Sequence, residues 1–201
     1  WECVHRLRRE KAALPAGYQL LPTFTPLGGL AYAGGIPRSE YMFDVMIQAF
    51  ANGATGLSVF DEHGIDDPGC FLALGRAISL AVPFEDVIMN GTTAPDAVRI
   101  HNSSAPALGS AMRHPDGRYF VAVTPSIAWL HTSCSEPAPV PVRFSFSTVG
   151  HGGGRVTLKD LVTGEEISCG KSCEVRRSLS ASAVFAATPI ASLGMEVDAA
   201  S

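Results

Sequence analysis

The chain has 201 residues, of which 46% are hydrophobic and 17% are charged, and its formal net charge is −4. This composition is typical of a globular chain with a well-buried core, and the weak acidic charge argues against nucleic acid or an anionic membrane as the main partner. No uninterrupted apolar run approaches the length that spans a bilayer.

Residues 1 to about 89 alternate between helix-like and strand-like patterns. The expected elements, in chain order, are a helix over 1–14, a strand over 18–25, a helix over 39–52, a strand over 57–60 and a helix over 67–81. The helix over 39–52 has so broad an apolar face that we expect it to be packed on two sides. Such alternation implies parallel strands joined by right-handed crossovers. The basic cluster of the first helix comprises Arg6, Arg8, Arg9 and Lys11, whose spacing suits a solvated face.

Two loops of this region hold the candidate binding residues. The loop over 26–38 is glycine-rich, contains Tyr32, and is long enough to form a wall of a binding cleft. The other loop follows the strand over 57–60 and begins with Asp61, Glu62 and His63. In a (β/α) barrel the chemistry lies where strands end at their carboxyl side, so these positions are candidates.

Three of the four candidates also have an ordinary structural explanation. Asp61 can act as a turn residue, His63 as a plain loop residue, and Tyr32 as part of the core. Glu62 has no evident capping role, which makes it the first residue to mutate.

From about residue 95 the pattern changes to short strands separated by turns. The expected strands cover 97–101, 107–113, 119–124, 140–148, 155–161, 165–168, 173–179 and 183–188. Pro115-Asp-Gly117 and Thr163-Gly164 predict turns between strands. This half therefore predicts an antiparallel β-sandwich, followed by a loosely held tail over 192–201.

Two kinds of residue favour a secreted protein. Asn90-Gly-Thr92 and Asn102-Ser-Ser104 match the N-glycosylation pattern. Cys169 and Cys173 stand between two strand-like segments, so a hairpin can bring their sulfurs together in a disulfide. A metal site would need further ligands near them, and we expect neither a metal nor a cofactor. The remaining cysteines, which leave an odd thiol, are Cys3, Cys70 and Cys134.

Several segments resemble parts of barrel glycosidases. Residues 40–56 resemble the penultimate barrel helix and its turn, residues 56–60 look like the eighth strand, and residues 71–78 with 83–91 look like the last helix and its exit. The sandwich pattern is similar at 114–124, 158–165 and 183–186. The chain thus resembles the C-terminal part of a (β/α)-barrel glycoside hydrolase. The resemblance implies the last two strand–helix units of a (β/α)8 TIM barrel over 1–92 and a β-sandwich domain over 93–191. Because Trp1 is not an initiator methionine, we also expect the chain to begin partway through a fold.

The resemblance implies a secreted protein that acts on or binds carbohydrate, with Tyr32, Asp61, Glu62 and His63 near the sugar. Glycosidases usually need two carboxyl groups across the scissile bond, and in the families resembled here they sit at the ends of the fourth and seventh strands. The fourth strand is absent from this sequence, and the presumed seventh, over 18–25, contains no Asp or Glu.

Two functional classes therefore stay open. One is a hydrolase whose catalytic carboxylates lie largely outside this chain. The other is a catalytically inactive, glycosidase-like structural or carbohydrate-binding component of an extracellular glycoprotein assembly. In both, the remainder of the barrel, on the same precursor or on another chain, is a partner.

Overall fold

The computed structural model describes residues 2–15, 18–24, 36–37, 39–59, 68–103, 105–125, 130–131, 138–149 and 154–190. Its helices are α1 (Glu2–Ala13), α2 (Ser39–Phe50), α3 (Pro68–Ala81) and α4 (Glu85–Asn90), with short 3₁₀ turns η2 (Val82–Phe84) and η3 (Pro95–Ala97). Its strands are β1 (Thr23–Phe24), β2 (Ile36–Pro37), β3 (Ser58–Val59), β4 (Thr92–Thr93), β5 (Val98–Ser103), β6 (Ala107–Arg113), β7 (Tyr119–Pro125), β8 (Leu130–His131), β9 (Val140–Ser147), β10 (Val156–Asp160), β11 (Glu166–Cys169), β12 (Ser172–Leu179) and β13 (Ala183–Pro189).

Two antiparallel sheets face one another across a shared core. The larger sheet has the order β11-β10-β13-β7-β6-β4, and the smaller has the order β12-β9-β5. The core between them takes Val121 and Phe185 from the larger sheet and Phe144 and Phe146 from the smaller. In β9 every second side chain, including both phenylalanines, is buried, because side chains alternate between the faces of a strand.

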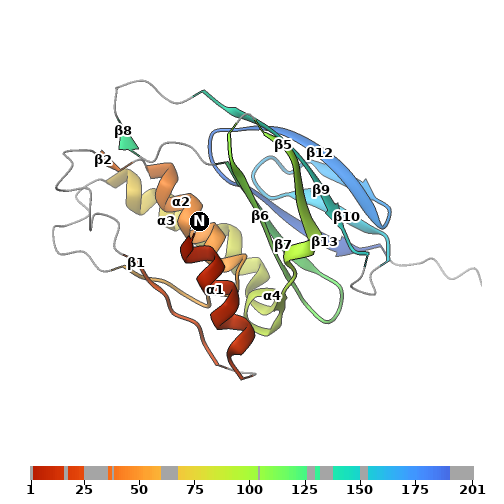
Figure 1. Cartoon of the computed structure of the whole chain (residues 1–201), viewed down its shortest axis with the longest axis horizontal. Helices are drawn as coiled ribbons and strands as arrows, with labels where there is room; N and C mark the ends of the chain where they lie inside the picture. Colours follow the sequence, from red (N-terminus) through yellow and green to blue (C-terminus); the bar gives the residue numbers. More distant parts are fainter. Residues whose placement is uncertain are drawn as a thin grey trace, which may run out of the picture.

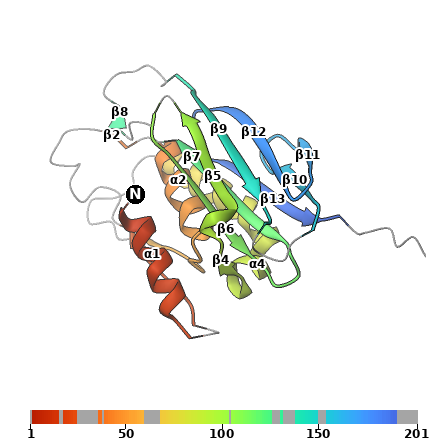
Figure 2. The ribbon, with the colours of Figure 1, turned by 45° about the vertical axis from the view of Figure 1, so that its right-hand side comes forward.

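Helices cover the other face of the larger sheet (Figure 1). The second core joins Phe43 and Ile47 of α2 and Val87 of α4 to Phe120 of β7 and Val184 of β13. Consecutive side chains of β7 thus enter different cores, which explains why the whole of that strand is buried. Helix α1 lies at the edge of this sheet that ends in β4 (Figure 2).

A short parallel pair lies apart from the two sheets. Thr23 of β1 is opposite Ser58 of β3, and Phe24 is opposite Val59, with α2 between the strands in sequence. The predicted parallel pairing is confirmed, but the strand expected over 18–25 is wrong in length. Regular pairing among residues 18–24 is confined to β1, although the backbone before β1 still bonds to the neighbouring segment: Thr55 N donates to Leu20 O at 2.9 Å and Ser58 N donates to Pro22 O at 3.0 Å.

The longer predicted elements agree closely with the structure. The three expected helices correspond to α1, α2 and α3, and β6 has the predicted bounds. The two predicted turns place Gly117 and Gly164 at φ +91° and +78°, a backbone region that glycine enters without steric cost. Helix α4 and the two-residue strands β2, β4 and β8 were not predicted. The expected tail over 192–201 lies outside the described residues.

The predicted disulfide between Cys169 and Cys173 is present, with Cα atoms 5.1 Å apart. The hairpin expected to carry it is wrong. Strand β11 pairs with β10 in the larger sheet, whereas β12 pairs with β9 in the smaller one. The disulfide therefore joins the edges of two sheets at the point where the chain crosses between them.

No helix within the described segments is long and apolar enough to cross a membrane.

Candidate functional site

The predicted sugar-facing residues Tyr32, Asp61, Glu62 and His63 all lie outside the described residues. The structure does describe β1 and β3, the two strands that precede their loops in the chain. Phe24 and Val59 are the last paired residues of two parallel strands. The loops that begin at residues 25 and 60 therefore leave the same carboxyl end of the pair, which we call the β1–β3 edge.

A second short pairing joins β2 to β8. Ile36 of β2 is opposite His131 of β8, and Pro37 is opposite Leu130, in antiparallel register. Strand β2, which precedes α2 in the chain, therefore lies beside β8, which follows β7 (Figure 1). Sequence reasoning missed this contribution of residues 130–131, because a two-residue strand leaves no periodic pattern to detect.

Helix α2, which connects the two strands of the pair, is anchored on the larger sheet by buried polar side chains. Gln48 Nε2 donates to Thr124 Oγ1 at 2.7 Å, and Ser110 Oγ donates to Gln48 Oε1 at 2.6 Å. Asn52 Nδ2 donates to Ser110 Oγ at 3.1 Å. Because buried polar groups destabilise a fold unless they are hydrogen-bonded, these contacts fix the position of α2 on β6 and β7.

Arg8 of α1 completes this network. Its Nη2 atom donates to Gly109 O and to Ser110 Oγ, each at 2.8 Å, and its Nε atom donates to Asn52 Oδ1. Burial lowers the pKa of Arg8, because it disfavours the charged guanidinium. The sequence prediction that this residue belongs to a solvated face is therefore wrong. The network positions α1 and α2, and through α2 the β1–β3 edge.

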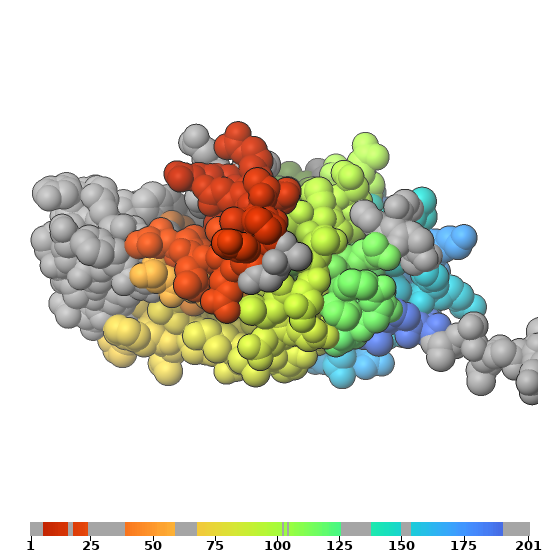
Figure 3. Space-filling model, turned by 90° about the horizontal axis from the view of Figure 1, so that it is seen from below, coloured from red at the N-terminus to blue at the C-terminus, as the bar shows by residue number. Residues whose placement is uncertain are grey.

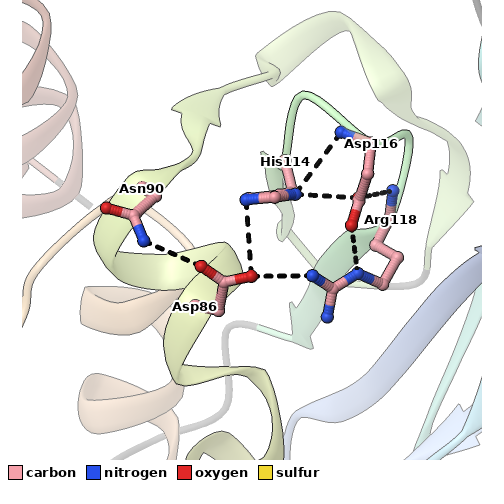
Figure 4. A network of polar contacts seen from close by, with 5 residues as sticks. All are labelled: Asp86, Asn90, His114, Asp116 and Arg118. Atoms are coloured by element: carbon pink, nitrogen blue, oxygen red, sulfur yellow. Dashed lines mark hydrogen bonds and ion pairs between the residues drawn. The ribbon is translucent and has the colours of Figure 1, made fainter.

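A separate charged network joins α4 to the turn between β6 and β7 (Figure 4). His114 lies between two carboxylates, with Nδ1 2.9 Å from Asp116 Oδ1 and Nε2 3.4 Å from Asp86 Oδ2. Arg118 also contacts both, with Nε 2.7 Å from Asp116 Oδ2 and Nη2 2.7 Å from Asp86 Oδ2. Asn90 Nδ2 donates to Asp86 Oδ1 at 2.7 Å.

These contacts lower the pKa of both carboxylates. Desolvation raises the pKa of Asp116, but hydrogen bonds from the backbone and side chain of Arg118 and from His114 outweigh it and bring the pKa to about 2. The hydrogen bonds from Asn90 and then from Arg118 lower the pKa of Asp86. Both aspartates are engaged with cationic and amide partners, so this network is a structural clamp rather than a catalytic acid–base pair.

A cavity of about 490 Å³ lies between the end of α1 and the junction of α4 with β4. Asn90, the acceptor of the first predicted glycosylation tripeptide, lines it and is exposed. The second acceptor, Asn102, lies in β5, and its side chain is outside the described part of the structure. No cluster of His, Cys, Asp and Glu that could hold a metal occurs among the described residues.

Comparison with known proteins identifies the fold. An α-amylase from Geobacillus thermoleovorans, solved with acarbose, matches 92% of this chain with a TM-score of 0.59 at 7% identity. A GH27 β-L-arabinopyranosidase from Geobacillus stearothermophilus matches 96% of it with a TM-score of 0.52 at 15% identity. The fold is glycoside hydrolase-like. At such identities the likeness concerns the fold alone.

The chain spans 42% of the length of each of these two enzymes. No protein-family model matches it, and no curated protein matches its sequence. The predicted glycoside hydrolase-like fold and its combination of helices with antiparallel sheets are confirmed.

Proposed function

We propose that this chain is the C-terminal part of a secreted glycoside hydrolase-like protein, and that its β1–β3 edge forms one wall of a cleft for carbohydrate. The observation that carries this proposal is the parallel pair joined through α2, whose two following loops leave one edge. In (β/α) barrels the binding site lies at the carboxyl ends of the strands. The glycoside hydrolase-like fold and the disulfide, which persists in oxidising compartments, support it.

Each predicted loop residue has a role suited to its chemistry. Glu62 and Asp61 accept hydrogen bonds from sugar hydroxyls, and His63 adds a further polar contact. Tyr32 stacks its ring against the apolar C–H face of the sugar. Glu62 is the residue on which binding depends most.

We further propose that β1 and β3 are the seventh and eighth strands of a TIM barrel over 1–92, and that the two packed sheets are a β-sandwich domain over 93–191. Within the described residues, β1 and β3 pair only with each other. Phe71, Leu72 and Val82 are 59%, 75% and 60% exposed on and just after α3. An apolar surface of this kind favours a covering partner, which the remainder of the barrel would supply.

A second candidate function has its own supporting observation. Residues 18–25, which include β1, contain no Asp or Glu at the position where the families resembled here place a catalytic carboxylate. This favours a catalytically inactive protein that binds carbohydrate or builds an extracellular glycoprotein assembly.

Turnover of a panel of aryl glycosides by the full-length polypeptide separates the two candidates. A hydrolase predicts turnover that falls sharply in Glu62→Gln and is unchanged in the matched control Glu85→Gln, since Glu85 is exposed on α4. Sugar binding without turnover across the panel favours the inactive protein. The absence of both binding and turnover would contradict the hydrolase and the carbohydrate-binding protein, and would leave only the role in an extracellular assembly.

A further inference from the structure

We propose that Asn90 carries an N-linked glycan whose innermost N-acetylglucosamine lies in the cavity between the end of α1 and the α4–β4 junction. The proposal rests on the secretion included in the proposed function, because such glycans are added in the secretory pathway. It does not depend on the carbohydrate cleft at the β1–β3 edge.

The acceptor tripeptide has a fixed backbone. Asn90 is the last residue of α4, Gly91 is extended at φ −80° and ψ 172°, and Thr92 begins β4. A Cβ atom at Gly91 would lie 2.1 Å from Val87 O and 2.8 Å from Arg113 O, so only glycine fits at this close approach of α4 to β6. Gly91 is buried, whereas its neighbours Asn90 and Thr92 are both exposed to solvent.

The side-chain amide of Asn90 has one hydrogen engaged and one to spare. Its nitrogen donates to Asp86 Oδ1 at 2.7 Å, and Arg118 Nη2 holds the other oxygen of that carboxylate at 2.7 Å (Figure 4). An asparagine amide nitrogen carries two hydrogens. The bond to Asp86 therefore orients the amide while the second hydrogen remains replaceable.

Glycan transfer is compatible with that hydrogen bond. The donor is a lipid-linked oligosaccharide pyrophosphate. Its C1–O bond breaks, the lipid pyrophosphate leaves with the electron pair, Nδ2 forms a bond to C1, and the proton that Nδ2 loses passes to the solvent. The remaining N–H still donates to Asp86. The linked sugar then starts from an amide that the network of α4 and the β6–β7 turn holds in place.

The cavity beside the amide suits a sugar ring. Its volume of about 490 Å³ falls within the range of small-molecule sites. Its apolar walls are Leu14, Pro15 and Met89, and its polar walls are Lys11, Thr92 and Thr93. Apolar walls match the C–H face of the ring, while the ammonium and hydroxyl groups can bond its hydroxyls and acetamide. Figure 3 shows the surface of α1 (red) beside the yellow-green surface of the segment that contains α4 and β4.

Two substitutions at Thr92 test whether Asn90 is modified. The full-length polypeptide is secreted from a eukaryotic host and its glycopeptides are analysed by mass spectrometry. The parent and Thr92→Ser, which keeps the tripeptide, should carry a glycan at Asn90, whereas Thr92→Ala should lose it. Both variants leave Asn90, its bond to Asp86 and the backbone pairing of β4 unchanged. An unmodified Asn90 in the parent overturns the proposal.

Hydrogen exchange tests whether the first sugar lies in the cavity. Exchange over residues 9–15 and 88–93 is compared between the glycosylated protein, the same protein trimmed to one N-acetylglucosamine, and the parent sequence produced in a host that adds no N-linked glycans. Slower exchange in both glycosylated forms than in the unglycosylated parent supports the proposal, and equal exchange in all three overturns it. Glycan-panel binding measured on the same preparations reports separately on the β1–β3 edge, so failure of one proposal is distinguishable from failure of the other.

Discussion

Replacing Arg8 by methionine tests whether α1, α2 and the larger sheet are held together by the buried polar network. The guanidinium donates to Asn52, to the carbonyl of Gly109 and to Ser110. Methionine keeps much of the apolar stem that packs between helix and sheet but removes every donor. Arg9 is exposed on the same helix, so Arg9→Met is a matched control.

The expected loss follows from the contacts. A hydrogen bond from a charged donor contributes about 1.5–3 kcal/mol, and a buried acceptor left unsatisfied costs about 1–3 kcal/mol. Ser110 retains its bonds to Gln48 and Asn52, and the desolvation that lowers the pKa of Arg8 is relieved. Taken together, we expect Arg8→Met to lower the free energy of unfolding by about 2–4 kcal/mol, and Arg9→Met by no more than about 0.5 kcal/mol.

Urea-dependent hydrogen exchange of residues 107–113 in the full-length polypeptide measures this effect locally, at β6. With an m-value of about 2 kcal/mol/M, the midpoint for this strand should fall by about 1–2 M in Arg8→Met. Equal midpoints for Arg8→Met and Arg9→Met would refute the reasoning, because the network would then contribute nothing to stability.

Three further predictions follow from the cores, the disulfide and the charged network. Phe120→Ala should lower the free energy of unfolding by about 3–5 kcal/mol in the same exchange assay, because the ring is fully buried between sheet and helices; a loss below 1 kcal/mol would contradict its place in that core. Cys169→Ser, which opens the short Cys169–Cys173 loop, should lower the free energy of unfolding by about 2 kcal/mol and speed proteolysis where the chain crosses between the sheets. Unchanged proteolysis would contradict a stabilising role for the disulfide. The pKa of Asp116 is lowered from 3.8 to about 2, so its contribution to the free energy of unfolding is present above pH 4 and is lost as the pH falls through 2. Because this side chain is 43% exposed, the contribution should be below about 1 kcal/mol. Asp116→Asn should therefore lose less stability than the parent between pH 4 and pH 2, and an identical pH slope would exclude a contribution from Asp116.

Strong periodicity made most of the fold predictable. Phe144 and Phe146 alternate with polar neighbours, which fixes both the strand and the face that is buried. The broad apolar face of α2 likewise predicted burial on two sides. In the structure this helix packs against α3 and against the larger sheet. Signals of this kind lie within one segment and need no knowledge of its partners.

The features that escaped prediction depend on contacts between distant segments. The turn at Gly170 suits a hairpin, but pairing partners elsewhere draw β11 and β12 into different sheets. Arg8 has the sequence context of a solvated residue, and it is half-buried because Asn52 and β6, both distant in sequence, pack against α1. Helix α4 is six residues long, too short for a periodic pattern, and its stability comes from packing Val87 into the helix–sheet core.

Glycan-array binding of the full-length polypeptide, with and without Glu62→Gln, tests the central claim most directly. If the β1–β3 edge forms a wall of a carbohydrate cleft, at least one glycan class should bind, and Glu62→Gln should weaken that binding about tenfold or more, the effect of losing roughly 1.4 kcal/mol of charge-assisted hydrogen bonding. Glu85→Gln should bind as the parent does. No binding to any glycan, or equal binding by all three proteins, would contradict the assignment of this edge to carbohydrate.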